Sequence, residues 1–218
     1  MKKQYLVIFS GILLIMLFVL GAYLYQSQRT QKLGFLAQEQ AELFVRPHSP
    51  ILGAPEAKVY LVEFMDPACE TCAAFSPFVK KMMADNPGRI KLIIRYAPFH
   101  DGADHFVKIL EAAKKQGKYW ETLDILYQSQ PYWASHHNPQ PQLAWRFLPM
   151  AGLDQEKIRT DMDDPAIQRI IDQDLADART LKVSKTPGFF VNGKPLVNFG
   201  YQELQQLVEA ELAAQYPQ

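Results

Sequence analysis

The chain has 218 residues, 48% of them hydrophobic, and its 23 basic residues balance 23 acidic ones. This apolar content is enough for one folded core with a subdomain attached. The zero net charge argues against nucleic acid as a partner, because no strong positive field would attract phosphates. Cys69 and Cys72 are the only cysteines, which excludes a framework of several disulfides. No cysteine is left over, so we expect both thiols to act together at one site.

The N-terminal segment predicts a membrane anchor. Residues 5–25 carry no charge and follow Lys2 and Lys3. As a helix this run would rise about 31 Å, close to the ~30 Å hydrocarbon core of a bilayer. A cleaved signal peptide is the alternative, but its apolar region is usually shorter, and the following GAYLYQSQ is a poor cleavage site. We expect residues 1–26 to be a retained anchor, with the rest of the chain outside the cytoplasm, where disulfides persist.

The polar stretch after this run predicts a linker. Residues 27–50 are first polar and then mildly amphipathic, and Pro47 and Pro50 interrupt them. We expect a linker with one short helix, which holds a folded domain of residues 51–218 away from the bilayer.

From Lys58 onward the pattern predicts an α/β domain. We expect strands over 58–64, 89–99 and two within 188–199, and helices over 70–88, 103–130 (two, meeting near Gly117), 141–152, 163–181 and 201–215. Asp164 and Pro165 suit the first positions of a helix, and Asn192-Gly193 suits a type I′ hairpin turn. The predicted fold class is α/β, a core sheet with an all-helical insertion over about 103–181 between its second and third strands.

The cysteine pair has two interpretations, and the first is half of a zinc site. Structural zinc needs four ligands, and the chain has no second C-x-x-C. The five histidines are His48, His100, His105, His136 and His137. Only His100 and His105 have a spacing that suits a metal. We therefore expect no metal site and expect all five histidines to be solvated loop residues.

The second interpretation is redox chemistry. Cys69 comes between a predicted strand and a predicted helix, so it should lie at a helix N-terminus, where free N–H groups stabilise a thiolate. A thiol with a pKa near ~8.5 is only about 3% thiolate at neutral pH, whereas a pKa of ~6 gives about 90%. Cys72 follows one turn later and should be less exposed. We expect Cys69 to react first with a substrate and Cys72 to resolve the mixed disulfide.

These motifs resemble those of the thioredoxin-fold thiol–disulfide oxidoreductases, especially the DsbA-like family with its helical insertion. The resemblance covers residues 58 to about 214. Cys69-Glu70-Thr71-Cys72 matches the redox motif, Pro77 a helix-kinking proline, and "TPGFFVNG" the family's TP-x-FFVNG pattern. The resemblance implies a thioredoxin-like core sheet, and it implies that the bond before Pro187 is cis, so that Thr186 faces the cysteines and pairs with a substrate peptide.

Glu63, six residues before Cys69, matches the acidic position that family members bury beneath the active site. Its strand is apolar on both faces, so the carboxyl should have a raised pKa or a partner. As a hypothesis, Glu63 relays protons to and from Cys72. The alternative is an acid at an edge or paired with a lysine such as Lys58.

Two departures from the family pattern leave the direction of electron flow open. Glu70-Thr71 is neither the basic-containing pair of strong oxidants nor the Gly-Pro of thioredoxin, and a carboxylate beside Cys69 opposes thiolate formation. Thr186 stands where strong oxidants often carry valine, and it resembles the isomerase-type members. The carboxylate of Glu70 predicts a weaker oxidant.

The sequence therefore predicts a membrane-anchored enzyme that exchanges disulfides with unfolded or exported proteins through Cys69 and Cys72. The resemblance implies a single-pass protein of the bacterial inner membrane with its catalytic domain in the periplasm. The thiols are themselves the redox carrier, so no cofactor is expected, and a membrane partner must reset them. A reductase or isomerase of the same fold is one alternative. A non-catalytic chaperone or metal-binding module that uses the thiols as soft ligands is another.

Overall fold

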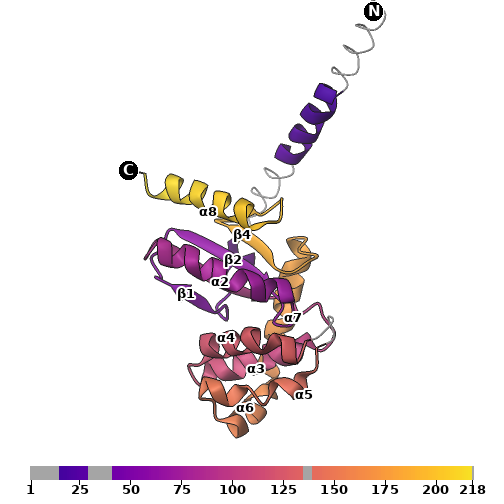
Figure 1. The fold of residues 1–218 in the computed structure, drawn as a ribbon, viewed down its shortest axis with the longest axis vertical. Helices are drawn as coiled ribbons and strands as arrows, with labels where there is room; N and C mark the ends of the chain where they lie inside the picture. Colours follow the sequence, from indigo (N-terminus) through magenta and orange to yellow (C-terminus); the bar gives the residue numbers. More distant parts are fainter. Residues whose placement is uncertain (1–14, 29–40, 135–138, 218) are drawn as a thin grey trace, which may run out of the picture.

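The computed structural model of the chain describes residues 15–28, 41–134 and 139–217, and Figure 1 shows their arrangement. Residues 15–28 are helical. The other elements are η1 (Ala41–Leu43), β1 (Ile51–Gly53), β2 (Val59–Met65), α2 (Glu70–Asp85), β3 (Ile90–Tyr96), α3 (Ala103–Lys115), α4 (Tyr119–Ser129), η2 (Gln130–Tyr132), α5 (Pro141–Ala144), η4 (Leu148–Ala151), α6 (Gln155–Met162), α7 (Pro165–Thr180), β4 (Gly188–Val191), β5 (Lys194–Pro195) and α8 (Tyr201–Gln215). The predicted thioredoxin-like α/β fold is confirmed.

The sheet has the strand order β1-β3-β2-β4-β5. β2 and β3 are parallel, because α2 connects them by a crossover, whereas β1, β4 and β5 pair antiparallel with their neighbours. β2 is therefore a central strand, as its apolar character on both faces predicted. The chain that leaves its carboxyl end carries the two cysteines.

The two faces of β2 lie in different cores. Leu61 and Met65 pack with α2, α8 and the helical insertion, while Val62 and Phe64 pack on the opposite face with the C-terminal part of α7. Since side chains alternate along a strand, Glu63 lies on the same face as Leu61 and Met65. The carboxyl group therefore lies on the side of the sheet that α2 covers.

The helical insertion runs from α3 to α7 and lies at the end of the molecule opposite α8 in Figure 1. Phe106 and Trp133 stack at its centre, with ring centroids 4.1 Å apart. The single helix predicted over 141–152 is wrong: α5 ends at Ala144 and the 3-10 helix η4 follows. The physical reason is Pro149, which cannot donate to the carbonyl four residues before it and collides with it in an α-helix.

Two local predictions are confirmed. Asp164 is the N-cap of α7, and its side chain accepts a hydrogen bond from the Ala166 N–H. β4 and β5 form the predicted hairpin, in which Asn192 and Gly193 have φ values of 47° and 79°. These left-handed conformations are the ones that a type I′ turn requires.

The predicted linker extends too far toward the C-terminus. Phe44 is fully buried beneath the sheet, and β1 begins at Ile51 and pairs with β3. Residues 41–50 are thus packed on the domain and do not act as a spacer, and the sheet begins before Lys58. Residues 29–40, which make up half of the predicted linker, lie outside the described residues.

A buried ionic cluster holds this N-terminal segment in place. The Arg95 side chain is inaccessible to solvent and donates to Asp174 and Asp177 of α7. Arg46 donates to both carboxylate oxygens of Asp177 at 2.9 Å, and His48 Nε2 lies 2.7 Å from Asp174 Oδ1. Burial raises the pKa of Asp177, but hydrogen bonds from Arg46 and Arg95 outweigh this effect and leave it below its usual value.

The predicted anchor falls partly on residues 1–14, which lie outside the described residues. Within the ranges that the structure describes, none of the helices combines the length and the apolar character that crossing a membrane requires. The helix of residues 15–28 contacts the domain near the hairpin, where Gln26 Nε2 donates to Asn198 Oδ1 at 3.1 Å.

Candidate active site

A tight turn delivers Cys69 to the start of α2. β2 ends at Met65, and the Cys69 N–H donates to the Asp66 carbonyl at 3.0 Å across Pro67 and Ala68. Asp and Pro are favoured at the first two positions of such a turn. Cys69 is the N-cap of α2, with extended backbone angles (φ −76°, ψ 119°). The predicted position of its sulfur at a helix N-terminus is confirmed.

The surroundings of Cys69 favour its thiolate. A hydrogen bond with Cys72 has the largest effect, and the Thr186 side chain and the backbone N–H groups of Cys72 and Thr71 add to it. Burial acts in the opposite direction, but the pKa of Cys69 still falls to about 5. Glu70 is exposed and is not among the largest influences. The expected opposition of this carboxylate to thiolate formation is therefore overcome.

Cys72 lies one turn further along α2 and is inaccessible to solvent, whereas Cys69 retains 6% exposure. The spacing predicted this order of accessibility. Burial, the hydrogen bond with Cys69 and the nearby Glu63 raise the pKa of Cys72 well above its usual value. Both residues are free thiols in the structure. The pair thus combines a thiolate that retains slight exposure with a protonated, fully buried thiol.

Glu63 is buried on the side of the sheet that α2 covers, and its Oε1 has no hydrogen-bond partner among the described residues. Burial, followed by the charge of Cys69, raises the pKa of Glu63 to about 8. The predicted raised pKa is confirmed. The alternative, in which Lys58 pairs with Glu63, is wrong, because Lys58 Nζ donates to the Gln215 carbonyl instead.

The loop before β4 closes the site from the opposite side. The Thr186–Pro187 peptide bond is cis, as the family resemblance implied. Cys69 Sγ lies 3.4 Å from the Thr186 carbonyl oxygen, although the two residues are 117 positions apart in the chain. The structure therefore brings Cys69, Cys72, Thr186 and Pro187 together, with Glu63 behind them.

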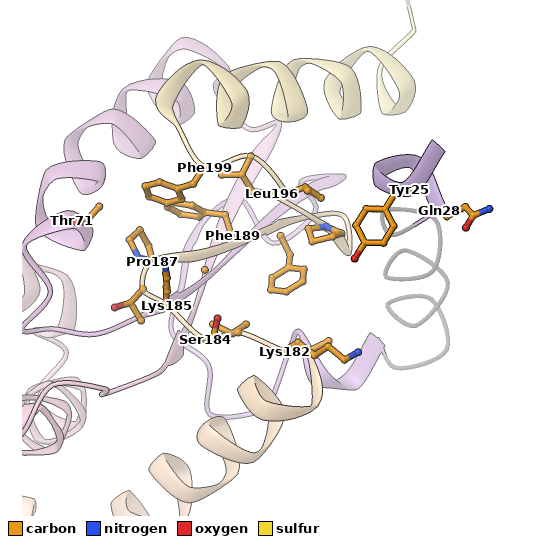
Figure 2. Close-up of a pocket in the computed structure, with 17 residues that line it drawn as sticks. Tyr25, Gln28, Thr71, Lys182, Ser184, Lys185, Pro187, Phe189, Leu196 and Phe199 are labelled. Atoms are coloured by element: carbon orange, nitrogen blue, oxygen red, sulfur yellow. The ribbon is translucent and has the colours of Figure 1, made fainter. Parts of the chain in front are cut away.

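A groove of about 1010 Å³ begins beside this loop (Figure 2). Thr71 and Pro187 lie at the end nearest the cysteines, and Phe189, Leu196 and Phe199 line the interior. Tyr25 and Gln28, from the helix of residues 15–28, line the far end in Figure 2. Phe199 is half exposed. Such a groove, with both polar and apolar side chains in its lining, can hold an extended peptide beside a reactive sulfur.

Sequence reasoning missed two side chains that hold the turn. Asp66 is fully buried and accepts the Ala68 N–H at 2.8 Å, and Gln130 Nε2 donates to the Pro67 carbonyl at 3.2 Å. Asp-Pro is a turn-initiating dipeptide, so Asp66 could have been found by this signal. Gln130 carried no such signal, because its contact depends on the packing of the helical insertion.

The expectation that all five histidines are solvated is wrong for three of them. His48 pairs with Asp174, His100 Nδ1 lies 2.8 Å from Asp66 Oδ2, and His105 accepts from Trp145 Nε1 at 3.2 Å. Residues 136 and 137 lie outside the described residues. Within the described part of the chain, no group of three or more His, Cys, Asp or Glu side chains could hold a metal ion.

Comparison with known proteins agrees with this geometry. A family model described as thioredoxin matches residues 46–210. The solved structure of a thioredoxin-like oxidoreductase from Silicibacter pomeroyi DSS-3 is 29% identical, with a TM-score of 0.68, and the match covers 78% of this chain and 96% of that one.

Two curated relatives extend the comparison. Disulfide bond formation protein D of Bacillus subtilis is 24% identical over 171 residues, which is 75% of this chain and 77% of the relative. A Na⁺/H⁺ antiporter NhaA of Herminiimonas arsenicoxydans is 30% identical over 146 residues, 67% of this chain. The chain spans only about a quarter of the length of such antiporters. The family model, the fold and the cysteine geometry agree, and the chain belongs to the thioredoxin family.

Proposed function

We propose that this chain is a membrane-anchored thiol–disulfide oxidoreductase that exchanges disulfides with exported proteins through Cys69 and Cys72. One observation carries the proposal. Cys69 lies at the N-terminus of α2 with a pKa of about 5, 3.4 Å from the Thr186 carbonyl and beside the buried Cys72. This arrangement suits a sulfur that must be both a reactive nucleophile and a good leaving group.

In the oxidising direction the reaction begins with a Cys69–Cys72 disulfide. A substrate thiolate attacks Cys69 Sγ, the bond to Cys72 breaks, and Cys72 leaves as a thiolate that takes up a proton. A second substrate thiolate then attacks the substrate sulfur of the mixed disulfide and releases the Cys69 thiolate. The substrate loses two electrons and gains a disulfide, and the enzyme becomes the dithiol. A low pKa at Cys69 favours this direction, because it stabilises the reduced enzyme.

Glu63 is proposed to carry the proton that Cys72 gains or loses. The two groups influence each other, since Glu63 raises the pKa of Cys72. Because the pKa of Glu63 is about 8, its carboxyl can both donate and accept a proton near neutral pH.

The substrate is proposed to bind as an extended segment along the groove, pairing with the backbone of Thr186. The loop carbonyl and the groove begin at the same place, beside Cys69. Backbone pairing would give affinity without sequence selectivity, which suits unfolded substrates of many sequences.

Residues 5–25 are proposed to anchor the protein in the bacterial inner membrane with its catalytic domain in the periplasm. The uncharged run after Lys2 and Lys3 supports an anchor. The apolar side chains between Ile15 and Leu24 are exposed in the structure. We also propose a regenerating membrane partner, because two cysteines alone have no internal means of recovering the disulfide.

An assay of the full-length chain in detergent tests the function. We expect thiolate absorbance at 240 nm to titrate with a pKa near 5, and reduced ribonuclease to regain its disulfides when the oxidised chain is added in excess. The equilibrium with glutathione measures the reduction potential and separates an oxidase from the reductase or isomerase that Thr186 suggests. Stoichiometric bound metal with no disulfide exchange would support a thiol metal-binding module instead.

Substitution of Glu63 by glutamine tests the proton relay. Glutamine has nearly the same shape but no base, so Cys72 would lose its proton to water. We expect resolution of a Cys69–glutathione mixed disulfide to slow about a hundredfold at pH 7. Rapid-quench kinetics between pH 6 and 8 measure this rate. Equal rates in both proteins across that range would eliminate the relay.

The same substitution has a separate effect on stability. Unfolded Glu63 ionises above pH 4.5, whereas the folded carboxyl stays protonated up to about 8. The folded state therefore binds the extra proton in this window, and the contribution of Glu63 to the free energy of unfolding falls as pH rises. We expect reduced Glu63→Gln to gain stability over the wild type between pH 5 and 8 in urea unfolding. A constant difference between the two proteins would show that this carboxyl titrates normally.

A further inference from the structure

One buried carboxylate joins the turn before Cys69 to a second loop. Asp66 Oδ1 accepts the Ala68 N–H at 2.8 Å, inside the turn itself. Asp66 Oδ2 accepts the Phe99 and His100 N–H groups at 2.8 and 2.9 Å and lies 2.8 Å from His100 Nδ1. Three of these four contacts come from residues 99–100, in the loop between β3 and α3. The side chain is fully buried, so these contacts offset the cost of removing the carboxylate from water.

The position of this contact gives it a role. β2 and β3 are parallel, and the Ala97 N–H donates to the Met65 carbonyl at 2.8 Å where the two strands end. Asp66, the next residue after Met65, extends the contact between the two chain segments beyond the strand ends, toward Cys69. Its backbone also forms a hydrogen bond with Cys72 that favours the Cys72 thiolate. Movement of Asp66 would therefore change the surroundings of both sulfurs.

We propose that Asp66 and His100 are positioning residues for disulfide exchange, which hold the turn of residues 66–69 so that Cys69 stays at the N-terminus of α2 and faces Thr186. This inference rests on the proposed function. Within the described part of the chain, the hydrogen bonds to the Asp66 carboxylate come from three backbone N–H groups and from the His100 side chain. Its imidazole donates to a carboxylate, and such charge-assisted bonds are stronger than bonds between neutral groups.

Other titratable groups also face the reactive sulfur. Cys72 comes from α2 and Glu63 from β2, and Tyr127 of α4 is close enough for both cysteines to raise its pKa. A substitution at His100 replaces none of these side chains. A change in the titration of Cys69 in a folded His100 variant therefore reports on the turn.

The test is His100→Ala in the full-length chain. Its side chain is 24% exposed, so its removal leaves little buried space. A looser turn weakens the N–H contacts to the thiolate, and we expect the pKa of Cys69 to rise from about 5 to about 6. The thiolate fraction of Cys69, followed by its absorbance at 240 nm, then falls about threefold at pH 5.5. It stays unchanged at pH 8, where Cys69 is ionised in both proteins.

Two variants serve as controls. His100→Asn can place an amide N–H where Nδ1 lies, and we expect it to restore the wild-type pKa and thiolate fraction of Cys69. Asp101→Ala changes the exposed neighbour in the same loop and should leave both unchanged. If His100→Ala does not fold by circular dichroism, His100→Gln replaces it, because its longer amide cannot occupy the Nδ1 position.

The outcomes are distinguishable. A raised pKa and a loss of thiolate at pH 5.5 in His100→Ala, with rescue in His100→Asn, support the positioning role. Wild-type behaviour of folded His100→Ala, or an equal defect in His100→Asn, overturns it and leaves the proposed function standing. A wild-type chain that exchanges no disulfides overturns the proposed function itself.

Discussion

Substitution of Cys69 by serine is expected to abolish disulfide exchange, with a loss of at least about a thousandfold, as when a covalent nucleophile is removed from an enzyme. Cys69 is the sulfur at the helix N-terminus and the more exposed of the pair. A serine hydroxyl is almost entirely protonated at neutral pH and forms no mixed disulfide. Oxidative refolding of reduced ribonuclease measures the loss.

Cys72→Ser is the matched control, because it removes the other thiol and leaves the reactive one. We expect it to capture substrates as stable mixed disulfides at Cys69, since no thiol remains to resolve them. Non-reducing gels and mass spectrometry of the captured species detect this, and the species formed in cells identify the substrates. Trapping at Cys72 in the Cys69→Ser variant, with none in Cys72→Ser, would reverse the assigned roles.

Substitution of Arg95 by alanine is expected to lower the free energy of unfolding by about 3–5 kcal/mol. The Arg95, Asp174 and Asp177 side chains are almost inaccessible to solvent. Removing the arginine leaves two buried carboxylates short of their shared partner, and it removes the contact of the guanidinium with the Phe64 ring. Urea unfolding at pH 7 measures the loss.

Arg46→Ala is the control for this prediction. Arg46 binds the same Asp177, but its side chain is 22% exposed, so water can replace part of its interaction. We expect a loss of about 1–2 kcal/mol. If the two variants lose the same free energy of unfolding, the buried interactions of Arg95 stabilise the protein no more than the partly exposed ones of Arg46. Wild-type exchange kinetics in folded Arg95→Ala would show that the cluster supports the fold and not the chemistry.

Local patterns in the sequence predicted a large part of this protein. The apolar residues of β2 and β3 predicted two central strands, and the helical spacing after Cys69 predicted α2. Asp164 and Asn192-Gly193 predicted a cap and a turn that the structure contains. Each of these features depends on neighbours within a few residues, and local backbone preferences are sufficient to specify them.

The family resemblance supplied what local patterns do not contain. The contact between Cys69 and Thr186 joins residues 117 positions apart, and no periodicity in the sequence indicates it. The cis bond before Pro187 was likewise implied by the TP-x-FFVNG pattern and not by its neighbours. The raised pKa of Glu63, by contrast, followed from an acid in an apolar strand and needed no family knowledge.

By itself, the sequence determined the order of strands and helices and a cysteine at a helix N-terminus. Only the tertiary structure decided that residues 41–50 pack on the domain, that Arg95 is buried with Asp174, and that Asp66 meets His100. The physical reason is that a charged residue is normally exposed, and its sequence neighbours do not reveal a distant partner that makes its burial favourable. Arg95 and Asp174 are 79 positions apart, and the folding of α7 against β3 alone brings them together.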